Sequence, residues 1–237
     1  MLSSLRHRRR SDELMDAPDA DPALVGKSLR FLRRVNRLLG YTRSTLHHLE
    51  RFSHAWKPDE PVRILDVATG SADLPRAILG WADRRGFRDV RVVGLDLHAT
   101  TAAAALAQNP DPRIEIVRGN ALQLPFADDS FDYVTTSLFL HHLDDDDVAR
   151  AIGEMSRVAR RGIIAGDLIR RRRAYLWIKL FTLFANPIVK NDGPASVAQA
   201  FTRDEILSLR DRAGATFADY FEHAGHRFVL AGEKSKI

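Results

Sequence analysis

Cysteine is absent from this chain of 237 residues. Disulfide bonds, thiolate metal sites and cysteine nucleophiles are therefore excluded, and with them pyrimidine C5-methylation by a cysteine that attacks the base. We expect an intracellular, cytoplasmic protein from this composition. Long apolar runs are also lacking, since none approaches the ~20 residues of a membrane-spanning helix. The first arginines precede no apolar core, so neither a membrane span nor a signal peptide is expected.

Acidic residues are missing from residues 1–10, which contain four arginines. The chain has 36 basic and 31 acidic residues, so residues 11–237 are nearly balanced at 32 against 31. The net charge of +5 thus comes mainly from this tail and not from a surface that would bind the phosphates of a nucleic acid. We predict a disordered basic tail over residues 1–10, and no nucleic acid as a partner.

Apolar residues at helical spacing predict an N-terminal helical lid over residues 11–57, with one helix ending at Gly40 and a second over 44–56. Helices that merely pack on the sheet are the alternative interpretation. From residue 58 onward strands and helices alternate, which is typical of one parallel α/β domain over residues 58–237. The predicted strands cover residues 62–68, 90–97, 113–117, the segment leading to Ser137, 162–168, 217–223 and 227–231.

The segment 170–190 begins with arginines and becomes strongly apolar. A helix that caps an apolar substrate pocket, a homodimer face and plain core are the three interpretations of it. Asn-Asp-Gly-Pro at residues 191–194 predicts a turn, and Thr202 with Glu205 predicts a capping box at the next helix.

The domain is organised around a strand, a loop of small residues and a helix start, with the sequence ILDVATGSADLP at residues 64–75. Small residues let a ligand approach the backbone closely, and a helix N-terminus offers free N–H groups to an anion such as a carboxylate. Asp66 and Asp73 flank the loop. Carboxylates at this place disfavour the pyrophosphate of a dinucleotide and favour a ligand that carries a cation.

Three further motifs follow later strands: GLDLH at residues 94–98, RGNALQLPF at 118–126 and DDSFDYVTTSLFLHHL at 128–143. With the loop, they resemble the motifs of class I S-adenosylmethionine (SAM)-dependent methyltransferases of the ubiquinone and menaquinone biosynthesis type, over about residues 60–170. Methyltransferases that tailor polyketide phenols are similar too. The resemblance implies an α/β, Rossmann-like, mostly parallel sheet of seven strands with order 3-2-1-4-5-7-6, the last strand antiparallel and helices on both faces.

The first motif of that family usually has three glycines, of which only Gly70 is kept. Ala68 and Ala72 stand at the outer two positions. Alanine takes a positive φ only at a cost, so the match at these two positions depends on a backbone that does not require it.

SAM is the cofactor that the resemblance implies, and no metal is expected. Asp66 would face the ammonium group, Asp96 would accept bonds from both ribose hydroxyls, and Asn120 would accept one from the adenine amino group. The implied cofactor contacts are Asp66, Ala68, Thr69, Gly70, Asp73, Asp96, Leu97, Asn120, Ala121, Leu122 and Ser137.

His141 and His142 follow the fourth strand at its carboxyl end, the edge where open α/β sheets bind ligands. An unperturbed histidine pKa of about 6.5 suits a general base for a phenol or enol. We predict His141 as the base and His142 as the second choice, with packing or helix entry as the alternative role of both. Asp167, at the end of the fifth strand, would orient a histidine or the substrate.

These predictions indicate O- or C-methylation of a small, apolar, phenolic or quinol-like acceptor. A nucleic-acid methyltransferase is one rival, although amino-directed base methylation usually uses an Asp/Asn-Pro-Pro-aromatic loop that is lacking here. A NAD(P) oxidoreductase and a non-catalytic SAM-binding protein are the other two.

Overall fold

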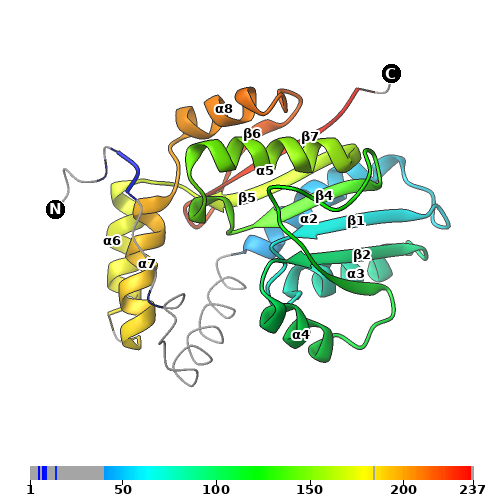
Figure 1. Ribbon diagram of the computed structural model, residues 1–237, viewed down its shortest axis with the longest axis horizontal. Helices are drawn as coiled ribbons and strands as arrows, with labels where there is room; N and C mark the ends of the chain where they lie inside the picture. Colours follow the sequence, from blue (N-terminus) through cyan, green and yellow to red (C-terminus); the bar gives the residue numbers. More distant parts are fainter. Residues whose placement is uncertain (1–4, 6, 10–13, 15–39, 184, 236–237) are drawn as a thin grey trace.

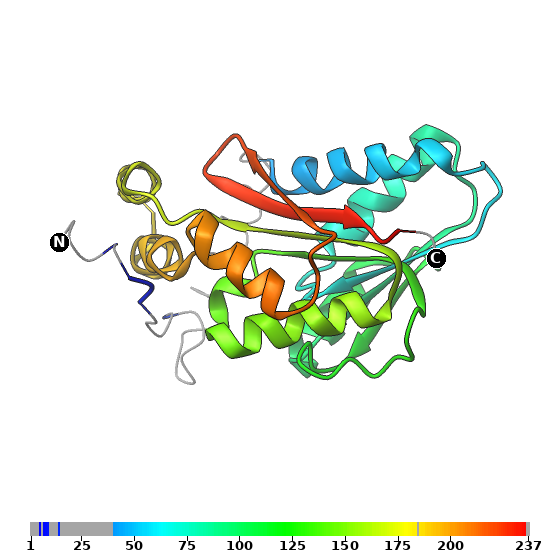
Figure 2. The ribbon, with the colours of Figure 1, turned by 90° about the horizontal axis from the view of Figure 1, so that it is seen from above.

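The computed structural model describes residues 5, 7–9, 14, 40–183 and 185–235. Its centre is a seven-stranded sheet with the order β3-β2-β1-β4-β5-β7-β6, and helices lie on both faces (Figures 1 and 2). Strands β1 to β5 are parallel, whereas β7 is antiparallel to both β5 and β6. The predicted Rossmann-like fold, strand order and antiparallel closing strand are confirmed.

The strands begin and end close to the predicted positions because most of them are short apolar runs rich in β-branched residues, with β6 as the exception. They are β1 (Val62–Val67), β2 (Val90–Asp96), β3 (Ile114–Arg118), β4 (Phe131–Ser137), β5 (Ala159–Leu168), β6 (Asp219–His223) and β7 (Arg227–Glu233).

The helices divide between the two faces of the sheet and one end of it. They are α2 (Tyr41–Phe52), η3 (Ser53–Ala55), α3 (Asp73–Arg85), α4 (Ala99–Gln108), η4 (Leu140–His142), α5 (Asp145–Val158), α6 (Arg172–Phe181), α7 (Pro187–Gln199) and α8 (Arg203–Arg212). Helices α2 and α3 cover one face, and α5 and α8 cover the other (Figure 2). Helices α6 and α7 pack together beyond the carboxyl ends of the parallel strands (Figure 1).

The alternation of side chains along a strand produces two cores. In β1, Ile64 joins the cluster under α2 and α3, whereas Leu65 and Val67 join the cluster under α5. All three side chains are fully buried, so β1 is held from both sides. The polar end of β1 is thereby fixed at the carboxyl edge of the sheet.

Two helix starts have side-chain caps, and the one at α8 is the predicted capping box. The carboxylate of Asp144 accepts a bond from the N–H of Asp147 at 2.9 Å at the start of α5. Thr202 and Glu205 form the capping box of α8. These caps explain the acidic run before α5 by helix capping rather than by metal binding.

The predicted turn at residues 191–194 is wrong, because this segment lies inside α7. The helix begins with an Asn186 cap and with Pro187 in its first turn, and it continues through Pro194. Gly193 serves packing instead of turning, since a Cβ there would lie 3.2 Å from Cγ1 of Ile178 on α6. The short helix predicted at residues 196–201 is the end of α7.

Helix α6 is exposed, which rules out the interpretation as plain core. Only Ala174 of this helix is buried, whereas Leu176, Trp177 and Leu180 are 54%, 38% and 71% exposed. The homodimer face stays a prediction. None of the helices in the described part of the chain is long and apolar enough to cross a membrane.

The predicted lid is described only in part. Helix α2 packs on the sheet beside β5 and β7, with Leu49 and Phe52 buried. The helix predicted to end at Gly40 falls on residues 15–39, which lie outside the described residues, so the lid stays a prediction.

Candidate functional site

The loop between β1 and α3 has an unusual backbone. Ala68, Gly70 and Ala72 all have positive φ angles, of 57°, 55° and 56°. The match to the family at the two alanines required a backbone without positive φ. That requirement is not met, because both residues adopt the left-handed conformation, at a cost of about 1–2 kcal/mol each. The loop keeps the three-glycine shape with only one glycine, so the neighbouring contacts must stabilise it.

Those contacts come mainly from Thr69 and β2. The N–H of Thr69 donates to the carbonyl oxygen of Leu95 at 3.0 Å. Gly94 lets the loop come this close, because a Cβ there would lie 2.8 Å from Oγ1 of Thr69. On Gly70, by contrast, a Cβ would meet nothing within 4 Å. The loop is packed on its β2 side and open above Gly70.

Asp66 is buried at the end of β1, with 2% of its surface exposed. Its two carboxylate oxygens accept bonds from the hydroxyls of Thr69 at 2.7 Å and Thr135 at 2.9 Å. Burial, opposed by these two bonds, raises the pKa of Asp66 to about 7. No arginine, lysine or histidine of the described segments forms an ion pair with it, so a cation nearby would favour its charged form.

Asp96 ends β2 and connects to the same loop. One of its carboxylate oxygens accepts from the N–H of Gly70 at 3.0 Å, and the other from the N–H of His98 at 3.0 Å. Each carboxylate oxygen can accept a further bond, which leaves capacity for a pair of ribose hydroxyls. The next residue, Leu97, is 53% exposed at this edge.

The predicted adenine contacts follow β3. Asn120 is exposed, and its side-chain oxygen accepts from the N–H of Leu122 at 2.9 Å. Ala121 is buried and Leu122 is half-buried. Asn120 therefore shapes the turn that presents these two apolar residues.

Ser137 and Asp73 lie at the two flanks of the loop. Ser137 ends β4 and is half-buried. Asp73 is the first residue of α3, and its carboxylate accepts from the Ser71 hydroxyl at 2.8 Å and forms an ion pair with Arg76. Asp73 therefore organises the helix start with these partners.

His141 and Asp167 form a buried pair. Nδ1 of His141 lies 2.7 Å from Oδ1 of Asp167, and the His141 N–H donates to Oδ2 at 3.0 Å. Burial raises the pKa of the Asp167 carboxyl, but His141 and the nearby N–H donors outweigh it and hold that pKa below its usual value. The aspartate thus fixes both the position and the tautomer of the imidazole, as in a base–orienter pair.

His142 has a different environment. Its ring centroid lies 4.1 Å from that of His141. Burial, followed by repulsion from His141, lowers the pKa of His142 to about 4. A histidine with so low a pKa is a weak base, so the geometry favours His141.

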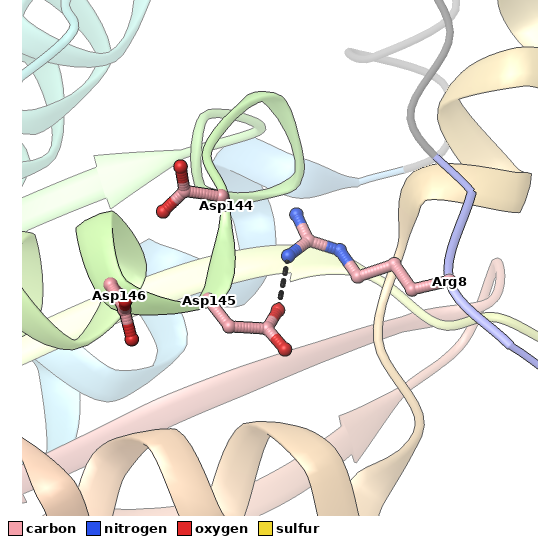
Figure 3. A pocket seen from close by; sticks show the side chains of 4 residues that line it. All are labelled: Arg8, Asp144, Asp145 and Asp146. Atoms are coloured by element: carbon pink, nitrogen blue, oxygen red, sulfur yellow. Dashed lines mark hydrogen bonds and ion pairs between the residues drawn. The ribbon is translucent and has the colours of Figure 1, made fainter.

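Arg8 connects the N-terminal segment to η4 and to the start of α5, where its guanidinium points toward Asp145 (Figure 3). Its guanidinium donates to the carbonyl oxygens of Leu140 at 3.4 Å and His141 at 3.1 Å, and forms an ion pair with Asp145 at 2.7 Å. Further bonds reach Leu143 and Gln199. At Arg8 the predicted basic tail is therefore bound to η4, while the extent of disorder over residues 1–10 stays a prediction.

Sequence reasoning missed Thr135 and Arg8. Thr135 lies beside Asp66 in the sheet register, and the signal was a polar Thr-Thr pair inside an otherwise apolar buried strand. Arg8 gave no signal, because one arginine of a basic run looks like the others.

The residues at this edge fit the implied cofactor. The loop is open above Gly70, the start of α3 follows it, and a buried carboxylate without a cationic partner lies beneath. Strands β1 and β4 are neighbours, but the chain continues from β1 to β2 on one side of the sheet and from β4 to β5 on the other. Their carboxyl ends therefore mark the switch point where ligands bind in open α/β sheets.

Comparisons with known proteins agree with this geometry. A family model described as "Methyltransferase domain" matches residues 65–165. The demethylmenaquinone methyltransferase of Roseiflexus sp. (strain RS-1) is 40% identical over 100 residues, which are 42% of this chain and 39% of that protein. The demethylmenaquinone methyltransferase of Bacillus subtilis (strain 168) is 34% identical over 183 residues, which are 70% of this chain and 76% of that protein.

Among solved structures, a SAM-dependent methyltransferase from Aquifex aeolicus has a TM-score of 0.55 at 16% identity, covering 85% of this chain and 97% of that one. This likeness shows the fold alone. The match to the Bacillus subtilis protein extends over most of both chains, whereas the Roseiflexus match spans less than half of each. The chain belongs to the class I SAM-dependent methyltransferases, in the group that contains the demethylmenaquinone methyltransferases.

Proposed function

We propose that this protein transfers the methyl group of SAM to carbon or oxygen of a small, apolar quinol or phenol. The observation that carries the proposal is the His141–Asp167 pair, which would supply an oriented base at the carboxyl edge of the sheet. The names of the relatives, demethylmenaquinone methyltransferases, support a quinol-like acceptor.

The cofactor would be held by the β1–α3 loop and by the ends of β2 and β3. Free N–H groups at the start of α3 would face its carboxylate, and Asp66 would act on its cationic end through the electrostatic field beneath the loop. Asp96 would accept from the ribose hydroxyls, and Ala121 and Leu122 would flank the adenine. SAM supplies an activated methyl group when bound.

His141 would accept the proton of an acceptor hydroxyl at Nε2, because Asp167 already takes Nδ1–H. The resulting phenolate is electron-rich at oxygen and at the neighbouring ring carbon. Attack by either atom forms the new bond to the methyl carbon as the bond to sulfur breaks. For attack at carbon, the ring C–H proton then passes to water and protonated His141 returns its proton to the oxygen, which restores the aromatic ring.

Helix α6 supports an apolar acceptor. Trp177 stacks on Phe181 with ring centroids 4.9 Å apart, and it lies 6.4 Å from the ring of His226 at the start of β7. Exposed aromatic residues at this end of the sheet offer a surface for an apolar ring or chain.

The test uses the full chain with methyl-labelled SAM and a reduced 2-prenyl-1,4-naphthoquinone, with products identified by mass spectrometry. We expect one labelled methyl group per acceptor. A matched acceptor with a methyl group already at the free ring carbon separates the two outcomes: it blocks C-methylation and leaves O-methylation possible. Tight binding of S-adenosylhomocysteine (SAH) without product from any phenol would instead indicate a non-catalytic SAM-binding protein.

A further inference from the structure

Arg227 is a buried arginine that lacks a hydrogen-bond acceptor. It is the first residue of β7 and is 1% exposed. Among the described residues, its Nε and Nη2 have no hydrogen-bond partner, and neither does the hydroxyl of Tyr41. The guanidinium carbon lies 4.0 Å above the centre of the Tyr41 ring, so the two residues form one site.

Nothing described in the structure neutralises this charge. Within residues 40–183 and 185–235, Arg227 forms no ion pair with a carboxylate, and Tyr41 is the group that acts electrostatically on its guanidinium. Buried charges in proteins are normally paired, because an unpaired one is costly to remove from water. A retained, unpaired guanidinium therefore indicates a partner that arrives with a ligand.

Arg170 shows what a structural buried arginine looks like in the same protein. Its side chain is fully buried, and it donates to the carbonyl oxygens of Ala200 at 2.5 Å and Leu5 at 3.2 Å and forms an ion pair with Glu205. Arg170 and Arg227 are both buried, and they differ in their hydrogen-bond and ion-pair partners.

Arg227 lies at the carboxyl edge of the parallel strands, where the methyl transfer is proposed to occur. In the register of β5 and β7 it lies opposite Leu168, one residue beyond Asp167. Asp167 acts electrostatically on Tyr41 as well, so the unpaired site lies near the His141–Asp167 pair. Trp177 of α6 reaches the neighbouring His226. A cationic site, a base and an apolar surface thus lie at the same end of the sheet.

We propose that Arg227 and Tyr41 bind an anionic oxygen of the methyl acceptor, with the guanidinium and the phenol both donating to it. The inference rests on the proposed function and specifies its acceptor, which must present a phenolate or carboxylate oxygen here. For a phenol, the site stabilises the charge that develops as His141 removes the proton. Such preorganised donors act most strongly where water is excluded.

The carboxylate of the cofactor is a different anion and belongs elsewhere. Strands β4 and β5 separate β1 from β7, and neighbouring strands lie about 4.8 Å apart. Arg227 is therefore roughly 14 Å along the sheet from the loop above β1. Cofactor affinity should not depend on it.

The test compares Arg227→Met with wild type in the full chain, using calorimetry with SAH and with three naphthalene probes. The probes are 2,4-dichloro-1-naphthol as its phenolate, 1-naphthoate, and 1-methoxynaphthalene, which has no anionic oxygen. In wild type with SAH, we expect the anionic probes to bind more tightly than the methoxy compound. Arg227→Met should weaken the preferred anion by about 10- to 100-fold, as expected for loss of a charged hydrogen bond, and leave SAH binding unchanged.

The preferred anion identifies the oxygen: stronger binding of the phenolate indicates a phenol acceptor, and stronger binding of 1-naphthoate indicates a carboxylate. Tyr41→Phe, which removes only one hydroxyl, should weaken the same probe without changing the fold. Arg227→Met should melt at or above the wild-type temperature, whereas Arg170→Met should melt well below it, since only Arg170 leaves acceptors without a donor.

The inference is overturned if all three probes bind wild type equally, or if Arg227→Met loses stability as Arg170→Met does. Failure of SAH to bind wild type would instead contradict the proposed function. The comparison of the three probes in the absence of SAH would still decide the role of Arg227.

Discussion

Replacing Asp66 by asparagine should stabilise the protein without ligand, and more so at higher pH. Burial raises the pKa of this carboxyl from 3.8 to about 7. Between these two values the folded state keeps a proton that the unfolded chain has lost, so stability falls as pH rises through this window. At 1.36 kcal/mol per pKa unit, the destabilisation reaches about 4 kcal/mol above pH 7. Asparagine carries no charge, and its amide can still bond the hydroxyls of Thr69 and Thr135.

The assay is urea unfolding of wild type and Asp66→Asn at several pH values from 4 to 8.5. The gap in unfolding free energy should open between pH 4 and 7 and then stay constant. Asp132→Asn is the matched control, because Asp132 is equally buried but forms ion pairs with Arg160 and Arg161. That variant should be destabilised, since Arg160 loses its carboxylate partner and Arg161 keeps only Glu60.

Cofactor binding gives an independent readout. A cation bound above Asp66 favours the carboxylate, so the affinity for SAM should rise with pH across the same window in wild type and not in Asp66→Asn. A stability gap that does not change with pH, or a variant less stable than wild type at pH 8, would refute the reasoning that Asp66 is an unpaired buried acid.

Three further substitutions test the site. Asp167→Asn should lower turnover by about 10²–10⁴-fold with little change in SAH affinity, because it removes the group that sets the tautomer of the catalytic base. Ala68→Gly should raise the unfolding free energy by about 0.5–1 kcal/mol, since glycine adopts a φ of 57° without strain. Arg8→Gln should lower the melting temperature and kcat together, at a cost of about 2 kcal/mol, because it removes charged bonds to the η4 carbonyls.

Two of these have a control in the same or the neighbouring segment. Ala77→Gly, in the helical backbone of α3, should destabilise by about 1 kcal/mol, the opposite sign to Ala68→Gly. Arg9→Gln should have no effect on kcat, because the Arg9 side chain is exposed. An unchanged rate in Asp167→Asn would mean that the His141–Asp167 pair only packs the sheet edge.

The strands were predictable because the sequence of a buried parallel strand is a short run of apolar residues. The strand order came from the motif resemblance, and the edge that gathers Asp66, Asp96 and His141 followed from that order. The capping box at Thr202 and Glu205 was also predictable, since capping depends on residues three positions apart.

Other features depend on tertiary context that local sequence does not encode. Gly193 and Pro194 look like a turn, but packing of α6 on α7 overrides their local preference. The positive φ of Ala68 and Ala72 is imposed by the contact of the loop with β2. Arg227 is the clearest case, because a missing partner is visible only when every neighbour is known.

The reversed direction of β7 determines which part of the chain would meet the proposed acceptor. Because this strand runs against β5, its first residue rather than its last stands at the carboxyl edge of the parallel strands. The tip of the closing hairpin, residues 224–226, is thereby on the side of the proposed acceptor site and far from strands β1 to β3. Substitutions in that tip would then change which molecule is methylated while the proposed cofactor site stays intact, so acceptor choice would be separable from cofactor binding.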